Sequence, residues 1–175
     1  MTKSARSSAT IEDAIPVFSS EERVVAANAI VKKNMYCAIG AGCVPVPLAD
    51  LVGVTTFQVV MIKQLSNLYG VKFSEHVARN LVVALLGTLS TRLITAGVVG
   101  SIFKFIPGFG AVLGGLLAVP AVAGAVTYAV GKVFVKHFEE GGTLLDLNVE
   151  KVRSFFAEQY KSGSKAAASA EPVSA

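Results

Sequence analysis

Apolar residues recur along most of this chain at helical spacing, and no segment shows the two-residue alternation of a half-buried strand. Proline and glycine interrupt the pattern, at "VPVP", at Gly70, at "KFIPGFG" and at Gly141–Gly142. Between these breaks the pattern predicts four long helices and a shorter amphipathic one, over 19–44, 47–69, 74–103, 111–140 and 146–160. We therefore expect an all-α fold of two apolar helical hairpins, with tips at 44–47 and 104–110, plus a short amphipathic C-terminal helix.

Residues typical of helix ends support these boundaries. Ser19 or Ser20 is a suitable N-cap for the first helix, because a serine hydroxyl can accept from a free amide of the first turn. Gly70 is placed to end the second helix, since glycine readily adopts the left-handed conformation that closes a helix. Pro107 and Gly108 mark the turn before the fourth helix.

Composition divides the chain into three parts. Residues 1–19 are rich in Ser, Ala and Thr, and residues 161–175 are rich in Ser and Ala. Such segments bury too little apolar surface to fold, so both are expected to be disordered tails. Residues 20–160 form the expected hydrophobic helical module.

The chain is unusually apolar. Hydrophobic residues make up 53% and charged residues 16%, against roughly 25% charged in ordinary domains. One small core cannot hide so much apolar surface, which suggests contact with lipid or another chain. From Phe105 to Gly131 no charge occurs, a stretch longer than the roughly 20 residues that cross a bilayer, although Pro120 should kink it. The second hairpin is therefore expected to cross, and the first to dip into the membrane or pack on protein.

The formal net charge is +4, and the bases lie singly or in pairs at the edges of apolar stretches. This distribution is typical of membrane flanks rather than of a nucleic-acid interface. Cytoplasmic loops are enriched in bases, so we expect both hairpins to insert from the cytoplasm and return to it, with both termini cytoplasmic. The bases that bracket the hairpins at their open ends are Lys32, Lys33, Lys63, Lys72, Arg79, Lys132 and Lys136.

No catalytic or cofactor-binding motif is evident. The nearest match to a phosphate-binding loop, "GAVTYAVGKV", has the wrong spacing and places Val133 where a hydroxyl is needed. His76 and His137 each lack the companion donors of a metal site. Cys37 and Cys43 point to different helix faces, so they are expected to be small buried residues. We predict a non-enzymatic protein that needs no cofactor or metal and binds no nucleic acid.

Small residues recur four or seven positions apart, as in Gly110–Gly114 and Gly124–Gly131. Small side chains let helix backbones approach closely, which drives helix association in lipid. The pattern predicts close helix–helix contact and favours a homo-oligomer.

Asp50 is an isolated carboxylate within an apolar stretch. If Pro47 is the first helical residue, Asp50 falls in the first turn, where the helix dipole stabilises an acid by about 0.3–1 kcal/mol. It also shares a face with Phe57 and Met61, where an unpaired charge would be costly. A second interpretation is an ion pair between Asp50 and Arg92 of the third helix, which would tie the two hairpins together. A proton or ion pathway is a third.

Three blocks of the sequence resemble the domain-of-unknown-function 697 family, the YcjF-type membrane module associated with bacterial GTPases. They are "PVPLADLVGVTTFQVVMIKQLSNLYGVKFS", "FIPGFG" and "TYAVGKVFVKHFEEGG", and the likeness spans roughly residues 25–160. The resemblance implies a membrane-associated helical protein with a separate Era- or dynamin-like GTPase as partner. It brings no catalytic residues. Its most specific block carries Pro45, Pro47, Asp50, Gln58, Met61, Tyr69 and Gly70.

The pattern and the resemblance together favour a non-enzymatic membrane-associated scaffold or anchor that self-associates and recruits a GTPase-type partner. Two alternatives stay open. One is an oligomeric pore or transporter subunit, in which Thr88, Arg92 and Thr95 would line a wet path. The other is a self-assembling soluble helical oligomer whose apolar hairpins pack together.

Overall fold

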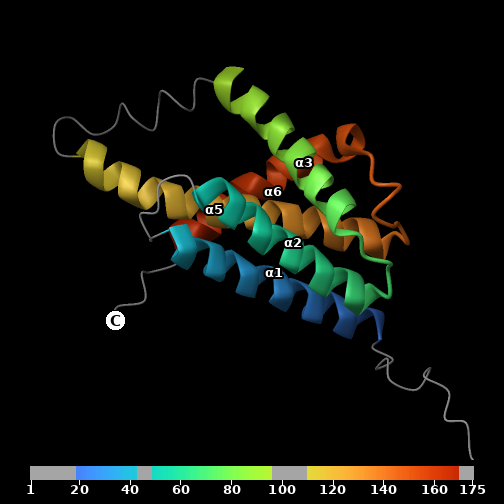
Figure 1. The fold of residues 1–175 in the computed structure, drawn as a ribbon. Helices are drawn as coiled ribbons and strands as arrows, with labels where there is room; N and C mark the ends of the chain where they lie inside the picture. The colour runs from blue at the N-terminus through green and yellow to red at the C-terminus, as the bar shows by residue number, and fades with distance from the viewer. Residues whose placement is uncertain (1–18, 43–48, 96–109, 170–175) are drawn as a thin grey trace, which may run out of the picture.

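The computed structural model describes residues 19–42, 49–95 and 110–169, with side chains described outside 42, 49–54, 89–95 and 110–119. Every regular element in these ranges is an α-helix, which confirms the predicted fold class (Figure 1). The helices are α1 (Ser20–Gly42), α2 (Ala49–Tyr69), α3 (Glu75–Thr95), α5 (Gly110–Glu139) and α6 (Val149–Ala168).

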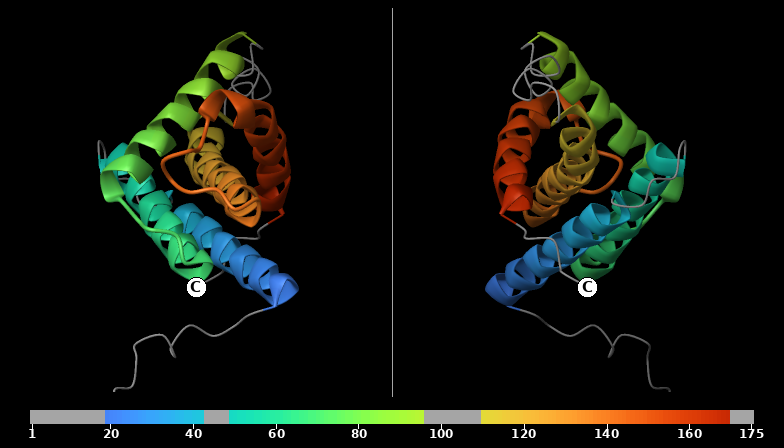
Figure 2. Two further views of the ribbon diagram at one scale, coloured as in Figure 1. Left: turned by 90° about the vertical axis from the view of Figure 1, so that its right-hand side faces the viewer. Right: turned by 90° about the vertical axis from the view of Figure 1, so that its left-hand side faces the viewer.

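Helix α5 is the centre of the bundle. It packs most extensively against α6 and α1, and also against α2. Helices α1 and α2 run side by side in opposite directions below it, and α6 runs beside it (Figures 1 and 2). Helix α3 crosses from α2 to α6 and contacts α5 only slightly. The predicted two-hairpin arrangement is not confirmed, because α5 takes α1 and α6 as its main neighbours within the described residues and contacts α3 only slightly.

The burial of α5 explains its composition. From Ala123 to Val135 every residue is buried except Tyr128 and Lys132, which are partly buried. A helix that is hydrophobic all round needs such a surrounding. The part of the charge-free stretch from Ala123 to Gly131 is thus covered largely by other helices of the same chain.

Glycines allow the close approach of these helices. A Cβ atom at Gly131 would lie 2.7 Å from a Val31 methyl on α1 and 3.0 Å from the Met61 sulfur on α2. On α6, a Cβ at Gly163 would lie 2.9 Å from the backbone oxygen of Ala125. The step from Gly124 to Gly131 thus serves helix contact, as predicted, but within one chain.

Across the described ranges, no helix combines the length and the hydropathy that crossing a membrane requires. Pro120 lies inside α5, which continues through it. The charge-free stretch that begins at Phe105 falls partly outside the described residues.

Helix ends follow the predicted chemistry with one exception. The Glu22 amide bonds Ser19 Oγ at 3.3 Å, and the Ser19 amide bonds a Glu22 carboxylate oxygen at 2.9 Å, which makes a capping box. Helix α6, however, does not end near Tyr160 but continues to Ala168. The prediction of disorder from residue 161 is therefore wrong, because Gly163 and Ala167 are buried against the bundle.

Cys37 is exposed, contrary to the expected burial.

Candidate functional site

Helices α2 and α5 end side by side in the same backbone motif. Gly70 has φ 66°, and the Val71 amide donates to the Ser66 carbonyl at 2.8 Å. Gly141 has φ 81°, and the Gly142 amide donates to the His137 carbonyl at 2.9 Å. Each glycine adopts the left-handed conformation that closes a helix and turns the chain away. The two predicted glycine stops are confirmed, and they delimit one end of the bundle.

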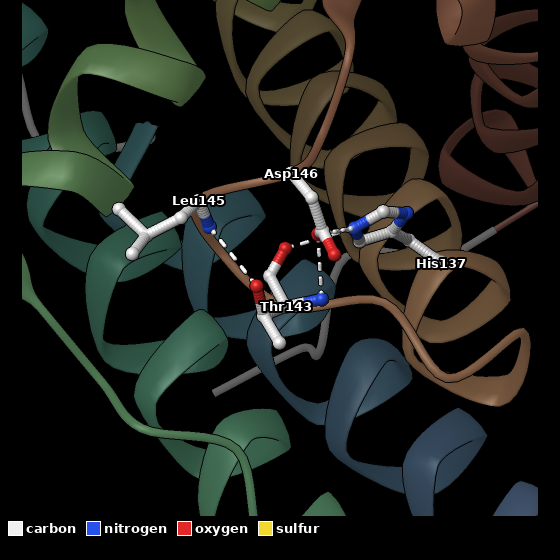
Figure 3. Close-up of polar contacts among 4 residues, drawn as sticks. All are labelled: His137, Thr143, Leu145 and Asp146. Carbon is white, nitrogen blue, oxygen red and sulfur yellow. Dashed lines mark hydrogen bonds and ion pairs between the residues drawn. The ribbon is translucent and has the colours of Figure 1, made fainter.

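The turn between α5 and α6 is fastened by His137 (Figure 3). Its Nε2 lies 2.8 Å from the Thr143 carbonyl oxygen and 2.9 Å from Asp146 Oδ1. The Thr143 amide donates to the same Asp146 oxygen at 2.7 Å, and the Leu145 amide donates to Thr143 Oγ1 at 3.4 Å. Gly142 packs against the imidazole so closely that a Cβ atom there would collide with the ring.

These contacts keep the Asp146 carboxyl ionised and fix the tautomer of the His137 ring. The Thr143 amide and then the His137 ring hold the pKa of Asp146 below its ordinary value, so this carboxyl is ionised at neutral pH. A carbonyl and a carboxylate can only accept, so the proton of the neutral imidazole is on Nε2. The Nε2 proton of His137 therefore has acceptors within the turn, and the histidine has a structural role.

Beside this turn lies a pocket of about 600 Å³. A neighbouring hollow of about 400 Å³ shares Glu139 with it and is otherwise lined by the start of α1. The pocket joins the start of α1, the end of α2 and the end of α5 with the turn that follows. Its lining residues are Arg23, Tyr69, Gly70, Val71, Lys72, Phe138, Glu139, Gly141, Gly142, Thr143, Leu144 and Leu145.

Tyr69 is central to the electrostatics of this pocket. Its ring lies 5.7 Å from the ring of Phe138, and the Arg23 guanidinium lies 5.9 Å from its centre. Burial raises the pKa of the Tyr69 hydroxyl, the nearby Glu139 carboxylate raises it further, and Arg23 partly opposes the shift. The hydroxyl is buried, and Tyr69 therefore stays neutral at physiological pH.

Leu145 is exposed at the pocket rim. It is 83% exposed, whereas Leu144 and Leu147 on either side are 2% and 7% exposed. Burial of these two neighbours and the Thr143–Asp146 bonds fix the turn that displays it. An apolar side chain held outward next to a pocket is well suited to contact another molecule.

The sequence-predicted site residues whose side chains the structure describes fall into two groups. Tyr69 and Gly70 lie at the pocket, opposite the "HFEEGG" end of α5, so two of the three blocks that carry the family resemblance meet there. Gln58, Met61 and Gly131 lie in the core. Gln58 is fully buried, and its carboxamide has no hydrogen-bond partner in the described part of the chain.

The remaining predicted residues lie outside what the structure describes. Asp50 is on α2 and Arg92 on α3, but their side chains are not described, so their pairing stays a prediction. The same holds for the small-residue pair Gly110–Gly114 at the start of α5. Pro45, Pro47, Pro107 and Gly108 lie outside the described ranges.

Sequence reasoning missed Arg23, Glu139 and Leu145. Each is separated in sequence from Tyr69, and no periodicity links them. One signal in the sequence could have located them. Ser19, Gly70 and Gly141 mark helix ends, and in an antiparallel bundle these three ends would lie together. Within the described residues, no group of three or more His, Cys, Asp or Glu side chains is arranged to hold a metal.

Comparison with known proteins agrees with the resemblance in the sequence. The profile of a family described as "Domain of unknown function (DUF697)" matches residues 6–165. A protein of Magnetospirillum gryphiswaldense named "Magnetosome membrane protein 22" is 38% identical over 153 residues, which cover 87% of this chain and 78% of that protein. No solved structure matches this chain.

Proposed function

This chain belongs to the DUF697 family, and from that membership we propose that it is a non-enzymatic, membrane-associated helical scaffold whose pocket at the bundle end docks a partner protein. The observation that carries the proposal is the likeness, over 87% of the chain, to a protein named for the magnetosome membrane. Neither the family description nor the relative's name attributes an enzymatic activity. We place the protein at a bacterial cytoplasmic membrane or an internal membrane, with its termini on the cytoplasmic side.

The pocket supports the docking part of the proposal. Its rim presents the exposed Leu145 next to the Arg23 and Lys72 cations and the Glu139 carboxylate. Contacts of this kind, an apolar anchor with charges around it, are typical of protein interfaces. Because the family resemblance points to a separate Era- or dynamin-like GTPase, that class is the partner we propose for this surface. Self-association through another face is compatible with it.

Membrane association is tested by fractionating cells that express the protein and washing the membrane pellet with alkaline carbonate. Recovery in the unwashed pellet is expected. Retention after the wash would indicate insertion, and release would indicate peripheral attachment. Recovery of the protein only in the supernatant would overturn the proposal.

Docking at the pocket is tested by co-purification with the partner class, using Leu145→Asp. This change puts a charge on the apolar rim and should abolish capture of the GTPase. Val83→Asp on α3 is the matched control, because Val83 is 58% exposed and lies outside the pocket lining. Equal capture by both variants and the native chain would show that the pocket is not the docking surface.

A second candidate is a self-assembling helical oligomer without membrane insertion. The burial of α5 by α1, α2 and α6 supports the lack of insertion, because this apolar helix is covered within the chain. Sedimentation of the detergent-free protein would separate it from the first proposal. An assembly of defined size that never pellets with membranes would favour the oligomer.

A further inference from the structure

Lys132 is a charged residue in the buried half of α5, and its direct contacts within the described residues are with the neutral side chains of Asn28 and Tyr128. Its ammonium donates to Asn28 Oδ1 of α1 at 2.7 Å. It also lies 5.9 Å from the centre of the Tyr128 ring, one turn earlier on α5. No carboxylate within the described residues is close enough to form an ion pair with it. The positive charge is thus positioned without being neutralised.

A second lysine adds to this charge. Lys32 lies one turn after Asn28 on α1 and is exposed. Burial lowers the pKa of Lys132, and the neighbouring charge of Lys32 lowers it further. Two like charges therefore face the same part of the α1–α5 surface, an arrangement that costs stability unless an anion compensates it.

Other bases of the described helices are paired with acidic side chains. Arg79 pairs with Glu75, Lys136 with Glu140 and Arg153 with Glu150, each within one turn of its own helix. These three pairs satisfy bases on α3, α5 and α6. Lys32 and Lys132 have no such neighbour, although Lys132 is the more buried and gains most from one.

We propose that Lys32 and Lys132 bind the phosphate group of an anionic phospholipid, with Asn28 fixing the Lys132 ammonium. A phosphate oxygen accepts several charge-assisted hydrogen bonds, and lysine supplies them as a compact point charge. The lipid source, rather than a soluble phosphate, follows from the surroundings. The Lys132 stem rises from the apolar core beside the Tyr128 ring, and tyrosine is favoured at the level of lipid headgroups.

This inference rests on the proposed membrane association and gives it a surface. Helices α1 and α5 lie side by side (Figure 2). The Lys132 ammonium bonds Asn28, one turn before Lys32 on α1, so the two lysines lie on one flank of the bundle. The pocket at the bundle end is a separate feature, since neither lysine is among its lining residues. Attachment through the flank is therefore distinct from docking at the pocket.

The test is flotation of the full chain with vesicles of phosphatidylcholine alone or mixed with phosphatidylglycerol. Native protein should float mainly with the anionic vesicles. Lys132→Met and Lys32→Met should each weaken that partition at least fivefold, the effect of about one lysine at a membrane surface. Lys63→Met, an exposed lysine on α2, removes the same charge and should change it less than twofold.

Four results would overturn the site. Equal loss with Lys63→Met would indicate diffuse attraction, and equal flotation with neutral vesicles would leave membrane association intact without a phosphate site. Flotation with neither vesicle would overturn the proposed function as well. Inorganic phosphate could also bind saturably, as seen by ³¹P NMR, and block flotation of native protein and Lys132→Met equally. That result would place the phosphate site elsewhere.

Thermal unfolding of each variant checks the fold. Because Lys32 is exposed, Lys32→Met keeps the test valid if Lys132→Met unfolds.

Discussion

Gln58 lies at the centre of the core with its carboxamide unpaired within the described residues. A buried amide without partners costs about 1–3 kcal/mol, because its hydrogen bonds to water are not replaced. Gln58→Met keeps the length of the side chain and removes the amide. It should raise the free energy of unfolding by about 1 kcal/mol, measured by urea denaturation.

Gln64→Met is the matched control for that measurement. Gln64 Oε1 accepts from Asn34 Nδ2 at 3.1 Å and so links α2 to α1. Its loss should lower the free energy of unfolding by about 1 kcal/mol. Destabilisation by both variants would show that the Gln58 amide does have a partner in the folded protein.

Asp146 makes the stability of the turn depend on pH. Its pKa is lower in the folded protein than its ordinary value of 3.8, so the folded state favours the ionised form. The stabilisation is present above the ordinary pKa and is lost as the pH falls through the lowered one. Asp146→Asn keeps an acceptor for the Thr143 amide but does not titrate.

Comparison of acid unfolding therefore isolates this carboxylate. Native protein should lose more stability than Asp146→Asn as the pH falls from 5 to about 2, with urea denaturation at each pH as the measurement. Parallel loss in both proteins would show that acid acts on other carboxyls.

Among the elements, the contact of α5 with α6 depends on Gly163. A methyl group there would meet the backbone of Ala125 and the ring of Tyr128 at 2.9 and 3.0 Å, so the helices would have to separate. Gly163→Ala should lower the free energy of unfolding by about 1–3 kcal/mol, as in other overpacked cores.

Gly87 provides the contrast within the same measurement. It lies in α3, where an added Cβ meets no atom of the described residues within 4 Å. Gly87→Ala should stabilise the protein by about 0.5–1 kcal/mol through helix propensity alone. A similar result at Gly163 would mean that α5 and α6 can separate freely.

Sequence reasoning succeeded where the cause is local. The serine N-cap, predicted at Ser19 or Ser20 and found at Ser19, and the glycine stops at Gly70 and Gly141 depend on neighbouring residues only, and all three are confirmed. The pairing of α5 could not be predicted, because a helix that is apolar on every face does not indicate which neighbour lies where. The extension of α6 was missed because Gly163 and Ala167 are typical of a loose tail by composition and become helical through contact with α5.

At the scale of the whole molecule, the same limit applies to the candidate site. Tyr69 and Gly70 could be selected from the resemblance, but Arg23, Glu139 and Leu145 join them only when three helix ends meet. The interior is easier to predict than the site, since burial follows from hydrophobicity whereas a pocket depends on the relative placement of separate segments.

The extension of α6 gives a prediction for the complete bundle. Ending the chain after Tyr160 removes Gly163 and Ala167 and uncovers part of α5. The loss should be about 2 kcal/mol, for roughly 80 Å² of apolar surface at about 25 cal/mol per Å². Thermal and urea denaturation measure it, and a chain that ends after Ser169 is the control. Equal stability of the two truncated proteins would show that the last turns of α6 contribute nothing.

The central position of α5 also determines when the protein can become stable during its synthesis. Helices α1 and α2 precede it in the chain, and their buried residues, such as Val31 and Met61, are covered by α5. They emerge from the ribosome before the helix that covers them has been made, and α5 in turn waits for α6. The nascent chain therefore exposes apolar surface until α5 and α6 have been translated, and in that interval this surface is prone to aggregation.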